Sequence, residues 1–327
     1  MLNESVAQNA NVILTNKTAD ERVDHMNIFL ACNAITALII DACLIFTVER
    51  RSGRRADLIL LTGFAVGNGL TSIGRMATGI MRASGYLNKQ KKMNPLQCIA
   101  VRYDLGILII GNDGLTLSGF LLSFERFMFF TNVNAYGRLF NPSASKKIIY
   151  CVFVVGLVDY LLCWMLAYSR RAVQMNAYCQ RSEITPPEYF AAYMVLTVLL
   201  GASSLAFYLL TFVSVSNSAR RTNENGLTQM RHTRERKILN GLSLISAIIV
   251  AMNLAPWCTY FFIFKSSYYQ SLFTAAQMLD NFYLPVSTLL YLIIHPDLAR
   301  PLRSTLCVRS CLRIFRRSKR ISVVYAG

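Results

Sequence analysis

LTLSGFLLSFERFMFF, residues 115–130, is the stretch that decides the fold of this chain. It begins as a nearly unbroken apolar run and ends in an acid–base pair, Glu125 and Arg126, followed by more aromatic residues. An ion pair is costly inside the hydrocarbon of a bilayer and much less so at the lipid–water boundary. We therefore expect Glu125 and Arg126 to lie where a membrane-spanning helix leaves the bilayer. Taken alone, the pair fits an interfacial anchor as well as a functional site.

The composition indicates an integral membrane protein. Hydrophobic residues make up 54% of the 327 positions and charged residues only 16%, whereas a soluble chain is about one quarter charged. A spanning helix needs about 20 predominantly apolar residues. Seven such runs are present, at 26–48, 58–83, 97–124, 148–168, 189–214, 239–264 and 272–294. We expect an all-α fold, a seven-transmembrane helix bundle with mostly short connections.

The distribution of basic residues predicts the topology of the bundle. Four segments hold 22 of the 34 Lys and Arg residues, namely 49–57, 125–147, 215–238 and 295–327. Positive charge concentrates in cytoplasmic loops, so the N-terminus is expected outside and the C-terminus inside. The net charge of +17 is then explained by anionic lipid and cytoplasmic partners rather than by nucleic acid.

Three regions follow from this topology. Residues 1–25 form an extracellular tail with two glycosylation sequons, at Asn3 and Asn16. Residues 26–294 form the bundle. In 295–327, apolar residues alternate with arginines, which predicts an amphipathic helix on the inner membrane surface and then a cytoplasmic tail. Its Cys307 and Cys311 are candidates for palmitoylation, although unmodified cysteines fit equally well. Membrane lipid is therefore an expected partner.

Polar residues inside the spans need partners within the bundle, because an ionisable group in the bilayer costs several kcal/mol otherwise. Asp41 of the first run is expected to point inward towards Asn68 of the second, more plausibly as a polar clamp between helices than as a ligand contact. Asp113 has two compatible interpretations, as the internal partner of Arg75 and as a polar anchor at the floor of an outward-facing cavity. The last run contains Gln277, Asp280 and Asn281, for which Asn253 and Asp113 are candidate partners.

Prolines and cysteines mark further features of the bundle. Pro256 in the sixth run predicts a bend, and both Pro256 and Pro285 of the seventh run are expected to serve as hinges. Of the nine cysteines, only Cys98 and Cys179 are expected at the outer, oxidising face. They are the natural pair for an extracellular disulfide between the second outer loop and the top of the third span.

These features together resemble the rhodopsin-type G-protein-coupled receptors, most of all the divergent serpentine chemoreceptors of nematodes. Glu125-Arg126-Phe127 stands in place of the family's Asp-Arg-Tyr, and Tyr291 precedes His295-Pro296-Asp297 at the start of the amphipathic eighth helix. The family's Asn-Pro-x-x-Tyr is altered, with Pro285 displaced and Ser287 in the first position. The family's span 1 asparagine and span 2 aspartate are exchanged, so its usual sodium site is in doubt.

The resemblance implies a receptor in the plasma membrane, with sensory cilia as one candidate location, and with no catalytic residue, cofactor or metal. A small-molecule or pheromone-like ligand would bind outside and a heterotrimeric G protein inside. The expected ligand contacts are Tyr103, Asp104, Asn112, Asp113, Trp257, Tyr260, Phe261, Gln277 and Asn281. The expected switch residues are Glu125, Arg126, Glu235 and Tyr291.

Other classes fit less well. A retinal protein needs a lysine in the seventh span, which has none, and the three histidines lie at or beyond span ends, so they cannot build a zinc site in the bundle. The alternative that stays open is a seven-span channel or transporter whose ion path is lined by Asp41, Asn68, Asp113, Asp159 and Asp280. The lack of an internal repeat counts against a transporter.

Overall fold

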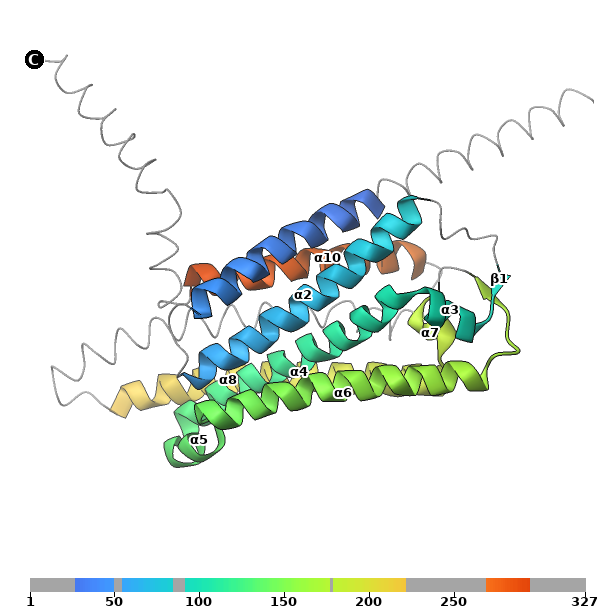
Figure 1. The fold of residues 1–327 in the computed structure, drawn as a ribbon. Helices are drawn as coiled ribbons and strands as arrows, with labels where there is room; N and C mark the ends of the chain where they lie inside the picture. Colours follow the sequence, from blue (N-terminus) through green and yellow to red (C-terminus); the bar gives the residue numbers. More distant parts are fainter. Residues whose placement is uncertain (1–26, 50–54, 85–91, 177–178, 222–268, 295–327) are drawn as a thin grey trace, which may run out of the picture.

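A computed structural model describes residues 27–49, 55–84, 92–176, 179–221 and 269–294. Over these ranges the chain is a helical membrane protein (Figure 1). The helices are Asn27–Glu49, α2 (Ala56–Ala83), α3 (Pro95–Val101), α4 (Tyr103–Thr131), α5 (Val133–Leu139), α6 (Pro142–Ser169), α7 (Arg181–Ile184), α8 (Pro187–Arg221) and α10 (Tyr269–Ile294).

Five described helices are long and apolar enough to cross a membrane: Asn27–Glu49, α2, α4, α6 and the Pro187–Ser214 part of α8. In α10 the stretch Met278–Ile293 is a shorter apolar helix. Large apolar side chains on α6 and α8 face outward, as Met165 does with 70% of its surface exposed. Such surfaces are stable against lipid tails and would aggregate in water. The expected sixth run, 239–264, lies outside the described residues, as do both chain ends.

The third expected run is wrong in one respect, because it is not one helix. Asn94 caps α3 by accepting from the backbone N–H of Gln97. The helix ends at Val101, because the backbone of the next residue, Arg102 (φ −94°, ψ 67°), is not helical. Arg102 then turns back to bind Asp104, with Nε 2.7 Å from Oδ1 and Nη2 2.5 Å from Oδ2. Side chains two positions apart do not face each other on a continuous helix. The break therefore allows the bidentate ion pair.

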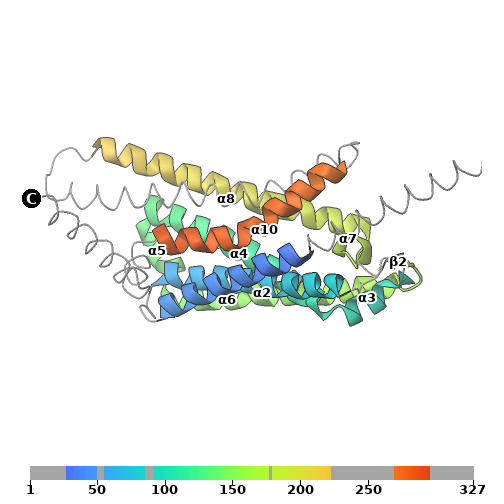
Figure 2. The same ribbon diagram turned by 90° about the horizontal axis from the view of Figure 1, so that it is seen from above.

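The all-α expectation is confirmed for the bundle, and the described strands are a single short pair outside its helices. Strands β1 (Lys92–Met93) and β2 (Met175–Asn176) pair antiparallel. They lie with α3 and α7 at one end of the bundle, while α5 lies at the opposite end (Figures 1 and 2). We call these the disulfide end and the Arg126 end.

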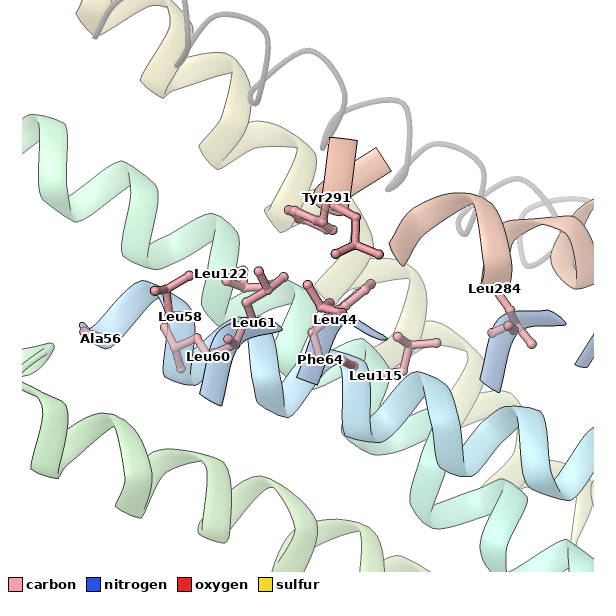
Figure 3. Packing of buried hydrophobic residues seen from close by; sticks show 14 of the residues in the cluster. Leu44, Ala56, Leu58, Leu60, Leu61, Phe64, Leu115, Leu122, Leu284 and Tyr291 are labelled. Atoms are coloured by element: carbon pink, nitrogen blue, oxygen red, sulfur yellow. The ribbon is translucent and has the colours of Figure 1, made fainter. Parts of the chain in front are cut away.

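The core of the bundle forms around α2, which packs against the Asn27–Glu49 helix, α4 and α10. Figure 3 shows Phe64 of α2 and Leu115 of α4 close to side chains from the neighbouring helices. The rings of Phe64 and Tyr291 meet edge-on with centroids 5.6 Å apart. Glycines let α2 and α4 approach closely, because a Cβ on Gly111 would lie only 2.5 Å from the backbone nitrogen of Thr71.

The disulfide end is closed by a covalent link. Cys98 of α3 and Cys179, just before α7, form a disulfide with Cα atoms 5.7 Å apart and 81 positions apart in sequence. Both are fully buried in a second apolar cluster with Ile99, Cys163 and Ala167. The link fixes the loop that carries α7 against the start of α4.

Replacing Cys179 with serine is expected to lower the free energy of unfolding by about 2–4 kcal/mol, because the crosslink closes a long loop. Thermal unfolding in detergent, followed by exposure of buried cysteines, measures the effect as a fall of several degrees. Cys151→Ser is the control, since Cys151 is a free, exposed cysteine and its loss should leave the unfolding temperature unchanged. Equal unfolding temperatures for the two variants would contradict the prediction.

Candidate functional site

A charge cluster lies at the Arg126 end, formed by Arg55, Asp57, Glu125 and Arg126. Arg126 Nε is 3.5 Å from Glu125 Oε2, and its Nη2 is 4.0 Å from Asp57 Oδ2. Asp57 also accepts from Arg55 Nη2 at 2.7 Å. Glu125 is 2% exposed. Two carboxylates from two helices thus hold Arg126, and neither contact is a tight bidentate pair, so the arrangement can be broken.

Elements around this cluster orient its members. Asn132 caps α5 by accepting from the Ala135 N–H at 3.0 Å, which places Tyr136 opposite Glu125. Burial raises the pKa of Tyr136, and the charge of Glu125 raises it further, so Tyr136 is a neutral phenol able to donate to that carboxylate. Tyr291 of α10 also lies within electrostatic range of Arg126. Two of the expected switch residues, Glu125 and Tyr291, are therefore gathered around Arg126.

Aromatic rings pack α8 against the same end of α4. The ring of Phe207 lies 5.2 Å from that of Phe127, 5.3 Å from Phe124 and 5.8 Å from Phe120, measured between centroids. Ring pairs at these separations are favourable beyond their buried area. Phe127, where the receptor family has tyrosine, therefore packs on α8.

A polar clamp joins three helices in the middle of the bundle. As expected, Asp41 faces Asn68, whose Nδ2 lies 3.0 Å from both carboxylate oxygens. Thr288 of α10 donates to Asp41 Oδ1 at 2.6 Å, and Asn68 also donates to the Leu284 carbonyl at 3.0 Å. Buried polar groups need such partners. The clamp fixes α10 against α2 and the Asn27–Glu49 helix.

Pro285 lies within α10 and has a visible consequence. A helical proline lacks the N–H that would bond the carbonyl four residues earlier, which here belongs to Asn281. The Asn33 side-chain amide donates to that carbonyl. The proline thus frees an acceptor that the first helix uses, and the expectation that Pro285 serves as a hinge stays a prediction.

A cavity of about 270 Å³ lies in the half of the bundle towards the disulfide end. Its described lining residues are Leu30, Arg75, Thr78, Arg82, Leu108, Asn112, Leu115, Thr116, Asp280 and Asn281. Within it Arg75 pairs with Asp280 and donates to Asn281 Oδ1 at 2.6 Å. Polar side chains of α2, α4 and α10 and three leucines share its lining, and its volume suits a small molecule.

Some of the expected ligand contacts line the cavity and others do not. Asn112 and Asn281 line the cavity. Tyr103 does not, because it is 62% exposed at the start of α4, and Asp104 is fully buried in its pair with Arg102. Asp113 is not the described partner of Arg75. It follows Asn112, and adjacent positions on a helix point about 100° apart, so Asp113 faces away from the cavity and lies 3.9 Å from Arg181.

The other expected residues lie outside what the structure describes. They are Asn3, Asn16, Glu235, Asn253, Pro256, Trp257, Tyr260, Phe261, Cys307 and Cys311, together with the side chain of Gln277. Among the described residues, no three or more His, Cys, Asp or Glu side chains gather to hold a metal ion. No protein-family model matches this chain, and no curated protein matches it.

Sequence reasoning missed two members of these clusters. Asp57 went unnoticed although it is an acidic residue directly after the basic run 50–55, where a helix start favours negative charge. Arg181 was the second, a residue of the loop between α6 and α8 that pairs with Asp159. Its proximity to Cys179 was a usable signal, because a disulfide-tethered residue cannot move far from the bundle.

Proposed function

We propose that this protein is a seven-transmembrane G-protein-coupled receptor of the chemosensory type, with its N-terminus outside the plasma membrane. In this proposal a small ligand enters the cavity lined by Asn112 and Asn281, and a heterotrimeric G protein binds at the Arg126 end. The observation that carries the proposal is that one helix, α4, contributes Asn112 to the cavity and Glu125 and Arg126 to the breakable charge cluster. Asn112 and Arg126 are about 20 Å apart along α4.

A stripe of side chains on α10 supports coupling between the two ends. Asp280, Leu284, Thr288 and Tyr291 recur at helical spacing on one face. Asp280 binds Arg75 at the cavity, Thr288 binds Asp41 in the clamp, and Tyr291 lies near Arg126. A ligand that competes for Arg75 would alter the position of α10 relative to α2. It would thereby shift the population of states in which Arg126 is released.

Internal pairing of the carboxylates supports a receptor over an ion path. Asp280 pairs with Arg75, Asp159 with Arg181, and Asp41 with Asn68 and Thr288. Charged groups that line an aqueous path keep water and mobile ions as partners, whereas these are engaged by neighbouring helices. The pairing is typical of a packed bundle that switches between arrangements.

The experiment is a screen of pooled odorants, pheromone-like compounds and peptides on cells that carry a G-protein dissociation sensor and are voltage-clamped. We expect at least one pool to dissociate a heterotrimeric G protein, with any current abolished by a G-protein inhibitor. A ligand-evoked current that persists under the inhibitor would favour the channel instead. Untransfected cells provide the baseline for each pool.

Asp57→Asn is expected to raise ligand-independent signalling about threefold to tenfold, because Arg126 loses one of the two carboxylates that the described residues place beside it, and coupling energies of this kind are about 1 kcal/mol or more. Basal G-protein dissociation at matched surface expression measures it. Arg55→Ala is the control, since it removes a different cation from Asp57 and leaves Arg126 beside both Asp57 and Glu125. Basal signalling that is equal in both variants would contradict a holding role for Asp57.

A further inference from the structure

A second polar cluster lies between α4, α6 and α8, away from the cavity. Asp113 is the eleventh residue of α4 counted from the disulfide end, and Asp159 lies about equally deep in α6. At about 1.5 Å per residue both are some 15 Å along their helices from that end. Two carboxylates therefore meet at one depth, and Tyr189 and Tyr193 of α8 lie beside them.

These four side chains surround a guanidinium group. Arg181 of α7 pairs with Asp159 through Nη2 and lies 3.9 Å from Asp113 through Nη1. Its guanidinium carbon is 3.6 Å from the centroid of the Tyr193 ring. Tyr189 donates its hydroxyl to Asp159. Carboxylates on the edge of a cation and an aromatic ring on its face are the arrangement by which proteins recognise organic cations.

The guanidinium group belongs to Arg181 of α7, which lies outside the spanning helices. Arg181 follows Cys179 by two positions, so the disulfide to Cys98 anchors the segment that carries it. Gln180 and Glu183 form a capping box on α7, and Arg170 donates to the Glu183 carbonyl at 3.0 Å. Because the segment is held in place, little conformational entropy is lost when the guanidinium enters the cluster.

The guanidinium of Arg181 stays charged in this buried cluster. Burial by itself would lower the pKa of Arg181, but Tyr193 and Asp159 raise it and the net shift is upward, so the group stays charged. Its side chain is 13% exposed and that of Asp113 10%. Removal of one partner from a buried ion pair is strongly destabilising, because the other charge is left uncompensated.

We propose that Asp113, Asp159, Tyr189 and Tyr193 form a binding site for organic cations of the guanidinium class, which Arg181 occupies as a tethered ligand. The site is distinct from the cavity around Arg75, whose described charges belong to α2 and α10. A small guanidinium compound competes with Arg181 for the site and fills it when the arginine side chain is removed.

Chemical complementation tests this proposal. Arg181→Ala, purified in detergent, is expected to unfold about 5–10 °C below the wild type, and millimolar agmatine is expected to restore most of that loss by mass action. The wild type, whose site is full, should gain little. Arg171→Ala is the matched control, since Arg171 is an exposed loop arginine that contacts only Tyr168 among described aromatic rings, and agmatine should not change its unfolding temperature.

Two further variants make the outcome decisive. Arg181→Ala combined with Asp159→Asn should no longer respond to agmatine, because the carboxylate that binds the guanidinium is gone. Arg181→Lys, which keeps the charge and lacks the planar fork, should fold with intermediate stability and respond only partly, which provides a reading if the alanine variant fails to fold. Agmatine stabilisation of equal size in Arg171→Ala, or none in any Arg181 variant, would overturn the proposal. The readout is stability, so it stands apart from the proposed receptor function.

Discussion

Replacing Arg126 with alanine is expected to abolish ligand-evoked G-protein activation while the protein still reaches the cell surface. Arg126 is held by Glu125 and Asp57 through contacts of 3.5 and 4.0 Å. After its removal Glu125 keeps Tyr136 and Asp57 keeps Arg55 as partners, so neither buried carboxylate is left unpaired. The receptor proposal makes Arg126 the group that is released to meet the G protein. Dissociation of the G protein, normalised to surface protein, should fall to the level of untransfected cells.

The control is Arg138→Ala, because Arg138 lies in α5 at the same end of the bundle and is exposed. It removes an equal charge from that surface without touching the cluster. We expect its signalling to stay within about twofold of the wild type, as for a surface substitution. Undiminished signalling by Arg126→Ala would remove Arg126 from the switch, and equal loss in both variants would indicate a general effect of surface charge.

Replacing Gly111 with leucine is expected to have the largest effect on folding. A Cβ at this position would lie 2.5 Å from the backbone nitrogen and 2.8 Å from the hydroxyl of Thr71, and backbone atoms cannot move aside as a flexible side chain can. The α2–α4 interface would have to open. We expect a loss of more than about 3 kcal/mol, measured as a near absence of folded protein at the cell surface and in detergent.

Gly137→Leu is the matched control for this substitution. Gly137 lies in α5, and a Cβ there meets nothing within 4 Å. The same side chain is introduced into a helix without a clash, so we expect folded yield close to that of the wild type. Folded yield of Gly111→Leu equal to that of Gly137→Leu would mean that α2 and α4 are not packed as closely as described.

The positions of the spanning helices were predictable from the sequence, because each spanning helix is a run of about 20 predominantly apolar residues. The expected runs 58–83 and 148–168 correspond to α2 and α6, which extend them by a few polar residues at the helix ends. The break at Arg102 was not predictable from hydropathy, because hydropathy interprets an arginine beside apolar residues as the boundary of a span and not as a break between two helices. It arises from a specific side-chain pair with Asp104, and only coordinates show that geometry.

The partners of polar residues were harder to predict than their inward direction. Asp41 binds Asn68, as expected. For Asp113 the sequence suggests Arg75 as one possible partner, whereas the side chain lies 3.9 Å from Arg181. Depth follows from counting along a sequence, whereas the angular position of each helix in the bundle depends on tertiary packing.

Nucleotide exchange is the measurement that tests the receptor proposal most directly. The protein is reconstituted in lipid nanodiscs with purified heterotrimeric G proteins of each class, and exchange is followed as pooled small molecules are added. We predict that at least one pool accelerates exchange with the wild type and not with Arg126→Ala. The proposal is contradicted if no pool raises the rate on any heterotrimer above that of discs carrying Arg126→Ala.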